Sequence, residues 1–344
     1  MARSPLDAVH RAAGARMAPF GGWDMPLEFS STLAEHGACR SAAAVFDVSH
    51  LGTVRLAADL GADAVARTLT NDIGRIGPGR AQYTHLLDDD GSVADDIIVW
   101  WRPDGVIDVM PNASNTDRVR AALGGTDVTS ERAVLAVQGP EARALLARIS
   151  PAAAAVGRFR VDVVEIGGAA CVVAGTGYTG EDGVEIAVPT PHAERLWSEL
   201  VAVGVLPAGL GARDLLRLEA GLPLHGSELG PGITPLQAGL GWVVSFDRPF
   251  KGREALIAER DAGPARRLRG IVTAGRRPPR AGSGVLLGDR PVGTVTSGNF
   301  SPTLGHGIAM ALLPAEVADD DLVAVDVRGS RLSGRVVPLP FLRR

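Results

Sequence analysis

The chain has 344 residues, of which 46% are hydrophobic and 22% charged, the balance of an ordinary globular protein with a large core. Its formal net charge is −4 and no basic block occurs, so composition gives no support for binding to nucleic acid or to an anionic membrane. The apolar runs fall short of the roughly 18 residues that span a bilayer, and the N-terminal stretch lacks an apolar secretion segment. We therefore expect a cytoplasmic protein.

The chain holds two cysteines, Cys39 and Cys171, too few for a disulfide framework and consistent with a reducing compartment. Cys39 follows His36 at a spacing found in metal sites, but no second cluster completes a set of four ligands, so we predict no metal. Lys251 is the only lysine, and a Schiff base could form there alone. Because Lys251 precedes an expected surface helix, we do not expect pyridoxal-type chemistry.

Helix and strand signals mix irregularly up to about residue 262. Apolar residues at helical spacing predict helices over 32–45, 58–71, 141–149, 192–204 and 212–222. β-Branched and aromatic runs predict strands over 82–87, 96–101, 106–110, 133–137, 163–166, 170–174 and 184–188. Two glycines after 163–166 predict a tight hairpin. Because strands and helices do not alternate regularly, we predict an α+β fold rather than a doubly wound sheet.

The character of the sequence changes after residue 262. The stretch DAGPARRLRG is typical of a linker. Short strands separated by turns are predicted beyond it, over 268–273, 284–287, 291–297, 322–328 and 334–337. This pattern predicts an all-β C-terminal domain.

The hexapeptide GTGYTG at 175–180 formally matches the G-x-G-x-x-G pattern of dinucleotide-binding folds. That pattern requires a preceding strand and a following helix, whose N-terminus holds the pyrophosphate. Here EDGVEIAV follows, two acids and then another strand, and acids in that place would repel a phosphate. We therefore interpret the segment as a tight acidic turn between two strands.

As a unit, TGYTGEDGVEI (176–186) resembles a motif of the glycine cleavage T-protein (aminomethyltransferase) family. The resemblance runs nearly end to end through segments in the same order. They are SPLDAVHRAAGARMAPFGGWDMPLEF (4–29), FDVSHLG (46–52), GSVADDIIV (91–99), QGP (138–140), GLGARDLLRLEAGLPLHG (209–226), PLQAGLGWVV (235–244), FKGREAL (250–256) and TSGNFSPTLGHGIAMALL (296–313). Each segment alone is weak, but the ordered set is specific to the family.

The resemblance implies a three-domain cloverleaf around a central tetrahydrofolate site, with two intertwined α+β subdomains in 1–262 and a C-terminal β-barrel domain in 263–344. The implied reaction moves the aminomethyl carbon from the lipoyl arm of H-protein to tetrahydrofolate, releasing ammonia and forming methylenetetrahydrofolate. Tetrahydrofolate is then a co-substrate, lipoylated H-protein a transient partner, and no metal is required. We expect a monomer without nucleic-acid or membrane partners.

The stretch GSVADDIIVWW (91–101) places Asp95 and Asp96 directly before a dense apolar strand. Neighbouring strand side chains face opposite sides, so one acid faces inward, where an unpaired carboxylate is costly. Asp96 matches the family's catalytic aspartate, and we expect it to be the inward acid, placed to stabilise an iminium-like one-carbon unit and to manage a proton near the folate nitrogens. The alternative is an exposed acid capping a turn. Asp95 should point away from Asp96, and we interpret it as structural.

Glu185 lies in the strand GVEIAV with apolar neighbours on both sides, so it is expected to be a buried carboxylate in need of donors. The aminopyrimidine edge of a pterin presents paired N–H groups that suit it; the alternative is a solvent-facing strand residue. Arg213, in GLGARD, matches an arginine that the family uses at its substrate site, and its planar fork suits a carboxylate or carbonyl group. The alternative is an ion pair with Asp214 or Glu219 on the same helix.

Tyr83 and Tyr178 are the only tyrosines, and both lie in segments shared with the family. Their rings can stack on folate or simply pack at strand ends. Asn112, in PNASN, is expected to hydrogen-bond the folate, with turn formation as the alternative. His50 stands beside a serine without a matching nucleophile pattern, and we interpret it as structural. The glycines of GLGARD and TGYTGEDG are predicted to serve turns.

Some positions depart from the family pattern. His225-Gly226-Ser227 replaces the usual Tyr-Gly-Gln, and VGRF replaces a tyrosine-bearing segment near 156–159. These changes leave open a second hypothesis, a tetrahydrofolate-dependent demethylase acting on an O-, N- or S-methyl donor. A third, of another class, is a non-catalytic folate-binding iron–sulfur assembly factor, but that branch carries a cysteine in a KGCY segment where this chain has KGREAL. We predict the aminomethyltransferase.

Overall fold

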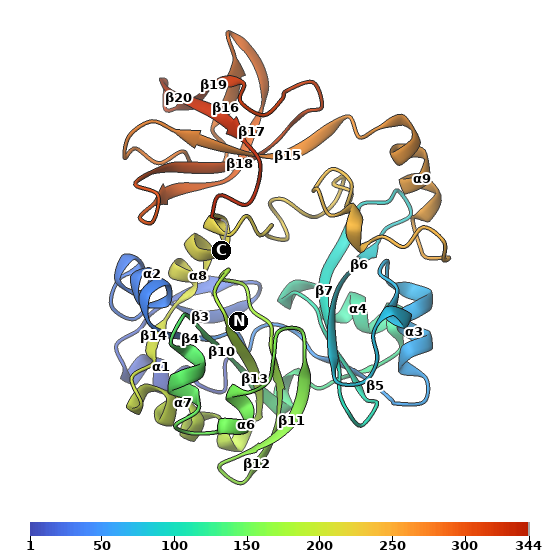
Figure 1. Ribbon diagram of the computed structural model, residues 1–344, viewed down its shortest axis with the longest axis vertical. Coiled ribbons are helices and arrows are strands. Elements are labelled where there is room, and N and C mark those ends of the chain that lie inside the picture. The colour runs from blue at the N-terminus through green and yellow to red at the C-terminus, as the bar shows by residue number, and fades with distance from the viewer. Residues whose placement is uncertain (343–344) are drawn as a thin grey trace. The chain divides into compact units, whose positions relative to one another are not determined.

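The computed structural model describes residues 1–342 (Figure 1). The chain divides into two compact units. Unit 1 consists of Met1–Leu86 and Asp95–Asp214. Unit 2 consists of Leu87–Ala94 and the chain from Leu215 onward. Within the described residues, no helix combines the length and the apolar character needed to cross a membrane.

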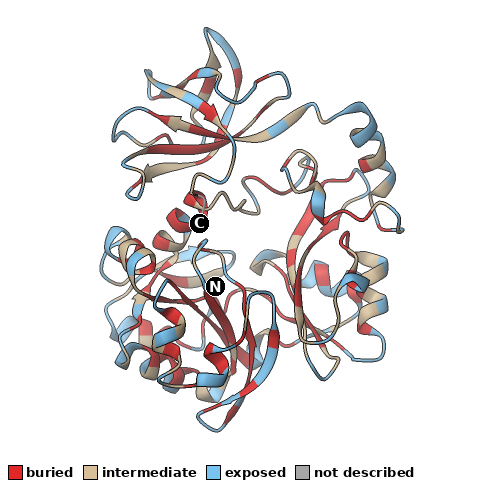
Figure 2. Cartoon of the chain, viewed as in Figure 1, coloured by how far each residue is buried: buried red, intermediate tan, exposed pale blue. Residues whose placement is uncertain are grey.

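A six-stranded sheet is the larger sheet of unit 1. Its strand order is β11 (Val161–Ile166), β12 (Ala169–Ala174), β13 (Gly183–Pro189), β10 (Arg132–Gln138), β4 (Ala44–Asp47) and β14 (Leu206–Ala208). Neighbouring strands are antiparallel except β4 and β14, which are parallel. All residues of β10 are buried, as an almost continuous apolar run in a central strand predicts (Figure 2). The helices that accompany this sheet are α1 (Asp7–Ala12), α2 (Thr32–Ser41), α5 (Ala142–Leu146), α6 (Pro151–Ala154) and α7 (Ala193–Ala202).

Two smaller sheets lie wholly or mainly in unit 1. The first has the order β1 (Ala2–Arg3), β3 (Trp23–Glu28) and β2 (Arg16–Phe20). The second has the order β6 (Arg80–Leu87), β7 (Val93–Trp101), β8 (Ile107–Met110), β5 (Val54–Leu56) and β9 (Thr126–Asp127). It is accompanied by α3 (Gly61–Thr68), α4 (Thr116–Leu123) and the short 3₁₀ helix η2 (Ala113–Asn115). This five-stranded sheet carries the acidic pair on β7.

Unit 2 contains a closed six-stranded barrel. Around the barrel the strands are β15 (Arg266–Thr273), β18 (His306–Pro314), β17 (Arg290–Ser301), β16 (Gly284–Leu287), β19 (Leu322–Val327) and β20 (Ser330–Val337). Ile271, Val285, Val325 and Val336 are among the fully buried residues of its core. The helices α8 (Leu210–Glu219), whose C-terminal half lies in unit 2, and α9 (Arg253–Ala262) precede it. The predicted α+β class with a C-terminal barrel is confirmed.

One predicted helix is partly a strand in the structure, and β18 is among the strands that were not predicted. The helix predicted over 32–45 ends at Ser41, and Ala44–Asp47 forms β4. Those four residues are fully buried and pair with β10 and β14, so tertiary pairing overrides the helical spacing. β18 was not predicted, because its small residues, such as Gly307 and Ala309, have low strand propensity; pairing with β15 and β17 on both sides imposes the strand.

The segment with the dinucleotide-like pattern lies between β12 and β13, and no helix follows it. Gly180 has a φ of +79°, which suits a tight turn there. The acidic turn between two strands is confirmed, although the first strand, β12, ends at Ala174 and does not extend into 176–178.

Candidate active site

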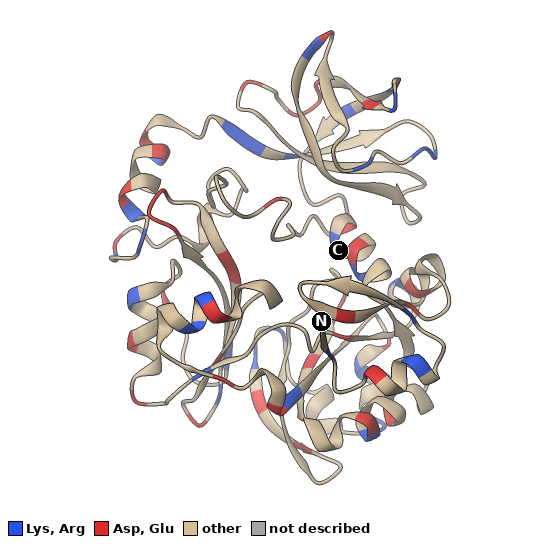
Figure 3. Cartoon of the chain, turned by 180° about the vertical axis from the view of Figure 1, so that it is seen from behind, with Lys and Arg blue, Asp and Glu red and all other residues tan. Residues whose placement is uncertain are grey.

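Asp95 and Asp96 are adjacent on β7, which carries the red acidic segment visible in Figure 3. Asp95 has no exposed surface, and Asp96 is partly exposed. A carboxylate oxygen of each lies within 4.8 Å of the other. This differs from the expectation of an inward Asp96 and a diverging Asp95. Asp95 is the buried acid, and the two carboxylates converge because they share a hydrogen-bond donor.

The shared donor comes from the loop between β8 and α4. Asn112 Nδ2 donates to Oδ1 of Asp95 and to Oδ1 of Asp96, both at 2.8 Å. The Asn112 backbone N–H donates to Asp95 Oδ2 at 3.1 Å, and Asn115 Nδ2 donates to Asp95 Oδ1 at 2.7 Å. Asp95 thereby receives the partners that a buried carboxyl group requires. Since the amide N–H groups of Asn112 point at the acids, its predicted folate contact rests on its carbonyl oxygen.

Tyr83, on the neighbouring strand β6, binds the other oxygen of Asp96. Its hydroxyl donates to Asp96 Oδ2 at 3.1 Å, and His85 Nε2 lies 3.3 Å from the same hydroxyl. Burial, followed by the charge of Asp96, raises the pKa of Tyr83 well above its ordinary value, so the phenol remains a donor. His85 was not predicted as a site residue. Its position two residues after Tyr83 was the available signal, since alternate strand residues share a face.

The environment of the pair separates the two acids electrostatically. Burial raises the pKa of Asp95 to about 8, and the charge of Asp96 adds to the shift, against the hydrogen bonds from Asn115 and Asn112. At neutral pH Asp95 is therefore an uncharged acid. Like charges this close in a buried place disfavour double ionisation. Asp96 is the member of the pair that a ligand can reach.

A second group of predicted residues comes from β13, the turn before it and α8. The guanidinium carbon of Arg213 lies 4.9 Å from the centre of the Tyr178 ring, a cation–π arrangement. Glu185 is buried on β13 and accepts a hydrogen bond from Thr176 Oγ1 at 2.6 Å. Burial lowers the pKa of Arg213, and the charge of Glu185 opposes that shift. Over residues 1–342, Arg213 Nη1 is buried and has no hydrogen-bond partner.

Electrostatic interactions connect the two groups. Tyr178 contributes, after burial and the charge of Asp96, to the raised pKa of Tyr83. Burial and then the charge of Arg213 lower the pKa of His50 to about 3, so His50 is neutral and is no candidate for a charged role. The structure therefore brings the predicted site residues into one region of unit 1: Tyr83, Asp96, Asn112, Tyr178, Glu185 and Arg213.

The acidic turn that carries Tyr178 is anchored by two arginines that were not singled out from the sequence. Arg40 Nη1 donates to Glu181 Oε1 at 2.6 Å, and both side chains are largely buried. Arg143 binds both carboxylate oxygens of Asp182, at 2.6 and 3.0 Å. The acids that appeared to repel a phosphate thus serve to fix the turn.

Gln138 holds the same turn through hydrogen bonds. It is fully buried, donates to the carbonyl of Thr176 at 3.2 Å and accepts from Thr179 Oγ1 at 3.1 Å. A Cβ added to Gly177 would lie 1.9 Å from Gln138 Oε1, and one added to Gly209 would lie 2.3 Å from the backbone of β3. Neither glycine has a left-handed φ. At these two positions the glycines allow close packing rather than the turns that were predicted.

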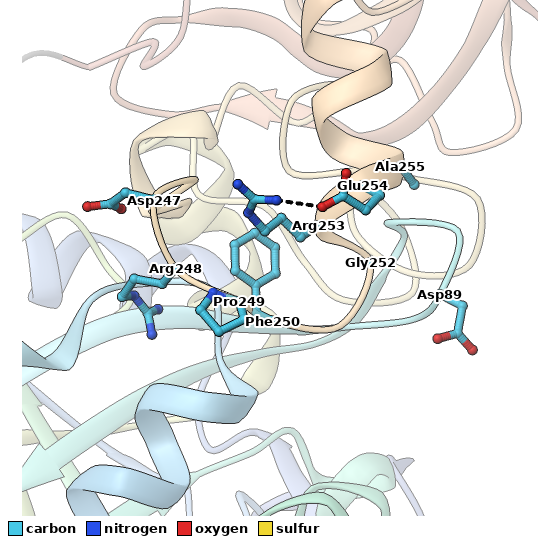
Figure 4. A pocket seen from close by; sticks show the side chains of 9 residues that line it. All are labelled: Asp89, Asp247, Arg248, Pro249, Phe250, Gly252, Arg253, Glu254 and Ala255. Carbon is cyan, nitrogen blue, oxygen red and sulfur yellow. Dashed lines mark hydrogen bonds and ion pairs between the residues drawn. The ribbon is translucent and has the colours of Figure 1, made fainter.

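A surface cavity of about 540 Å³ lies in unit 2, beside the N-terminus of α9 (Figure 4). Three of its charged lining residues take part in ion pairs: Arg253 pairs with Glu254 at 2.5 Å, and Asp89 pairs with Lys251 at 3.5 Å. None of the predicted site residues lines it. The cavity is therefore not the candidate active site.

Known proteins resemble this chain over its whole length. Residues 6–248 match the GCVT N-terminal domain, and residues 266–342 match the glycine cleavage T-protein C-terminal barrel domain. The aminomethyltransferase of Mycobacterium avium (strain 104) is 46% identical, over 98% of this chain and 96% of that protein. The aminomethyltransferase of Parafrankia sp. (strain EAN1pec) is 47% identical, over 99% of this chain and 97% of that protein.

A solved structure agrees with these sequence matches. The crystal structure of glycine cleavage system aminomethyltransferase T from Bartonella henselae matches with a TM-score of 0.92 and 31% identity, over 99% of this chain and 98% of that one. The resemblance inferred from ordered segments is confirmed. The chain belongs to the glycine cleavage T-protein family of aminomethyltransferases.

Proposed function

We propose that this chain transfers the one-carbon unit from aminomethyl-lipoyl H-protein to tetrahydrofolate, with release of ammonia, as the aminomethyltransferase of a glycine cleavage system. The observation that carries the proposal is the carboxylate of Asp96. It is partly exposed, bound at both oxygens, and adjacent to an Asp95 that is uncharged at neutral pH. We also propose that the protein acts as a cytoplasmic monomer, with lipoylated H-protein as its transient partner and without a metal.

The reaction determines what the site must do. The aminomethyl carbon exchanges its bonds to sulfur and nitrogen for bonds to two nitrogens of tetrahydrofolate. Those nitrogens lose two protons, of which one ends on ammonia and the other on the lipoyl thiol. Between the two exchanges the carbon is positively charged, and a carboxylate fixed beforehand lowers the energy of that state.

Asp96 meets this requirement. Tyr83 holds one oxygen at 3.1 Å and Asn112 holds the other at 2.8 Å, so the carboxylate is oriented before a substrate arrives. Partial exposure leaves it accessible to the charged carbon. An acid in this place can also accept a proton from a folate N–H group.

Glu185 and Arg213 supply the binding chemistry. The buried carboxylate of Glu185 suits the paired N–H donors of the pterin aminopyrimidine edge, because donors compensate its burial. Arg213 Nη1, which has no partner among residues 1–342, suits a carbonyl or carboxylate oxygen. We assign stacking on the folate rings to Tyr178 and Tyr83. The carbonyl oxygen of Asn112 is assigned a folate N–H group.

The test is tetrahydrofolate-dependent ammonia release from aminomethylated, lipoylated H-protein. Asp96→Asn keeps the size of the side chain and removes its charge. Loss of one such preorganised contact typically lowers kcat by about 10²- to 10³-fold, so we expect a fall of that order with folate affinity little changed. Asp117→Asn, at an acid of α4 whose side chain is 90% exposed, is the matched control and should keep the native rate.

Two outcomes contradict the proposal in different ways. A native protein that binds folate but releases no ammonia excludes the aminomethyl transfer, and methylated donors then become the substrates to test. Full activity of Asp96→Asn leaves the reaction in place but removes the role assigned to Asp96.

A further inference from the structure

We propose that Asp95 is a positioning residue of the transfer reaction, which sets the carboxylate of Asp96 through the side-chain amide of Asn112. This inference rests on the proposed function, because it concerns the acid that the reaction uses. Asp95 has no exposed surface and so does not touch the substrate. Its effect has to pass through a neighbour, and the hydrogen bonds identify that neighbour.

The Asn112 amide has two N–H groups, one for each carboxylate. Its Nδ2 is 2.8 Å from Asp95 Oδ1 and 2.8 Å from Asp96 Oδ1, so the buried acid fixes the donor that orients the exposed one. Asp95 is itself held at both oxygens, by Asn115 Nδ2 at 2.7 Å and by the Asn112 backbone N–H at 3.1 Å. Asp95 and the two asparagines thus form a rigid support under Asp96.

A merely structural role gives little reason for an acid at this position. Asp95 lies between the buried residues Ala94 and Ile97 along β7, and an apolar side chain would avoid the cost of burying a carboxyl group. The pKa of Asp95, about 8, limits that cost, because the group is uncharged at neutral pH. An uncharged acid can accept the asparagine amides without adding a second negative charge beside Asp96. The position of Asp95 and its uncharged state both suit a residue that supports the carboxylate of Asp96.

A double-mutant cycle tests the inference on the full chain. Asp95→Ala and Asp95→Asn are each made in the native and in the Asp96→Asn background, and kcat and the KM for tetrahydrofolate are measured. Asp95→Ala should lower kcat by about 100-fold, the typical effect of misplacing a reacting group by about 1 Å, and change KM little. In the Asp96→Asn background the further loss should be under about 3-fold, because no charge remains to be positioned.

Asp95→Asn should lie between native and Asp95→Ala. The new amide keeps one oxygen to accept from Asn115 and from the Asn112 side chain. Its N–H group, however, faces the backbone N–H of Asn112, which leaves a buried donor without an acceptor and a loss of about 10-fold. This partial rescue is not expected if the position merely fills space.

Asp108 provides the matched control. It lies on the adjacent strand β8, is 2% exposed, and is bound by Arg55 at 2.7 and 3.2 Å. Asp108→Ala removes a buried acid from the same sheet and acts through folding alone. Any loss it causes should be the same factor in both Asp96 backgrounds.

A second readout does not depend on turnover. The chain has two tyrosines, so ¹³Cζ-tyrosine labelling gives two NMR signals, which Tyr178→Phe assigns. The Tyr83 signal reports the hydrogen bond to Asp96. Asp95→Ala should shift this signal in the native background, and should leave it unchanged when Asp96 is already Asn.

The outcomes separate this inference from the proposed function. If Asp95→Ala lowers kcat by the same factor in the native and in the Asp96→Asn background, as expected for Asp108→Ala, then Asp95 is a structural residue and the inference is overturned. Native kcat in Asp95→Ala does the same. If the native protein releases no ammonia, the proposed function fails, and the NMR cycle alone decides: coupling supports the positioning role, and an unshifted or uncoupled Tyr83 signal overturns it.

Discussion

The packing beneath the acidic turn makes Gly177→Ala a sharp test of how Tyr178 is positioned. The backbone of Gly177 is not left-handed, so alanine is conformationally acceptable there. Space is the obstacle, because the added Cβ would lie 1.9 Å from Gln138 Oε1 and 2.5 Å from its Cδ. Gln138 cannot easily swing away, since it is fully buried and bonded to the carbonyl of Thr176 and the hydroxyl of Thr179. Either the glutamine or the turn has to move.

The destabilisation expected for Gly177→Ala can be estimated from the hydrogen bonds of Gln138 that are lost and from the overpacking. Displacing Gln138 costs about 1 kcal/mol of stability for each net hydrogen bond that it makes. Overpacking a full interior adds about 1–3 kcal/mol. We expect Gly177→Ala to destabilise the protein by about 2–4 kcal/mol, a fall in Tm of about 5 °C or more. If the turn moves instead, Tyr178 leaves its place against Arg213, and folate affinity falls by about 10-fold.

Thermal unfolding and folate titration measure both consequences. Gly37→Ala is the matched control, because Gly37 lies within α2, has no atom within 4 Å of an added Cβ, and is not left-handed. It should stabilise the protein by about 0.5–1 kcal/mol through helix propensity. Adding Gln138→Ala to Gly177→Ala makes room for the methyl group. Gly177→Ala should therefore destabilise the Gln138→Ala protein less than it destabilises the native protein. Native Tm and folate affinity in Gly177→Ala would refute the reasoning.

Three further outcomes are expected. Glu185→Gln should weaken tetrahydrofolate binding by about 10-fold or more in a calorimetric titration, because a hydrogen bond to a charged group contributes about 1.5–3 kcal/mol; Glu165→Gln, at an exposed acid on β11, should have no effect. The pKa of Asp95 is raised to about 8, so the folded state keeps a proton that the unfolded state loses near pH 4. Stability should therefore decline as pH rises from about 4 to about 8, and Asp95→Asn should flatten that decline in a Tm series. Burial raises the pKa of the Cys171 thiol to about 11, so mass spectrometry should find it alkylated by iodoacetamide at mild alkaline pH only after denaturation.

The sequence predicted the strands and turns that depend on residues adjacent in the chain. The hairpin of β11 and β12 is one example: Gly167 and Gly168 have φ values of +58° and +81°, which a two-residue turn of this hand requires. The strand predicted over 184–188 occurs as β13, Gly183–Pro189. The strands bounded by turns in the C-terminal region occur likewise. In each case the residues that decide the structure are adjacent in the sequence.

The hydrogen-bond partners of the site residues could not be predicted in the same way, because they come from segments that are distant in the sequence. Motifs identified Asp96 and Tyr83, but the link between Asp95 and Asn112 depends on how β7 pairs with β8. That register, with Ile98 opposite Met110, brings the loop after β8 back to the acids at the start of β7. A one-residue slip would turn every side chain to the other face, so the link depends on the pairing of two strands and not on the residues around Asp95 alone. The predicted role of Asn112 therefore omitted its two nearest partners.

A neutral Asp95 fits the role proposed for Asp96. Arg213 is the one cation among the predicted site residues, and Asp95 is the acid whose pKa burial raises to about 8. Asp96 is the accessible acid, and in the proposed reaction its carboxylate complements the cationic carbon. Were Asp95 also ionised, the second negative charge would favour protonation of Asp96 and remove the charge that the proposed mechanism uses. In the proposed mechanism, the complete burial of Asp95 thus keeps its neighbour charged, and the burial itself contributes to catalysis.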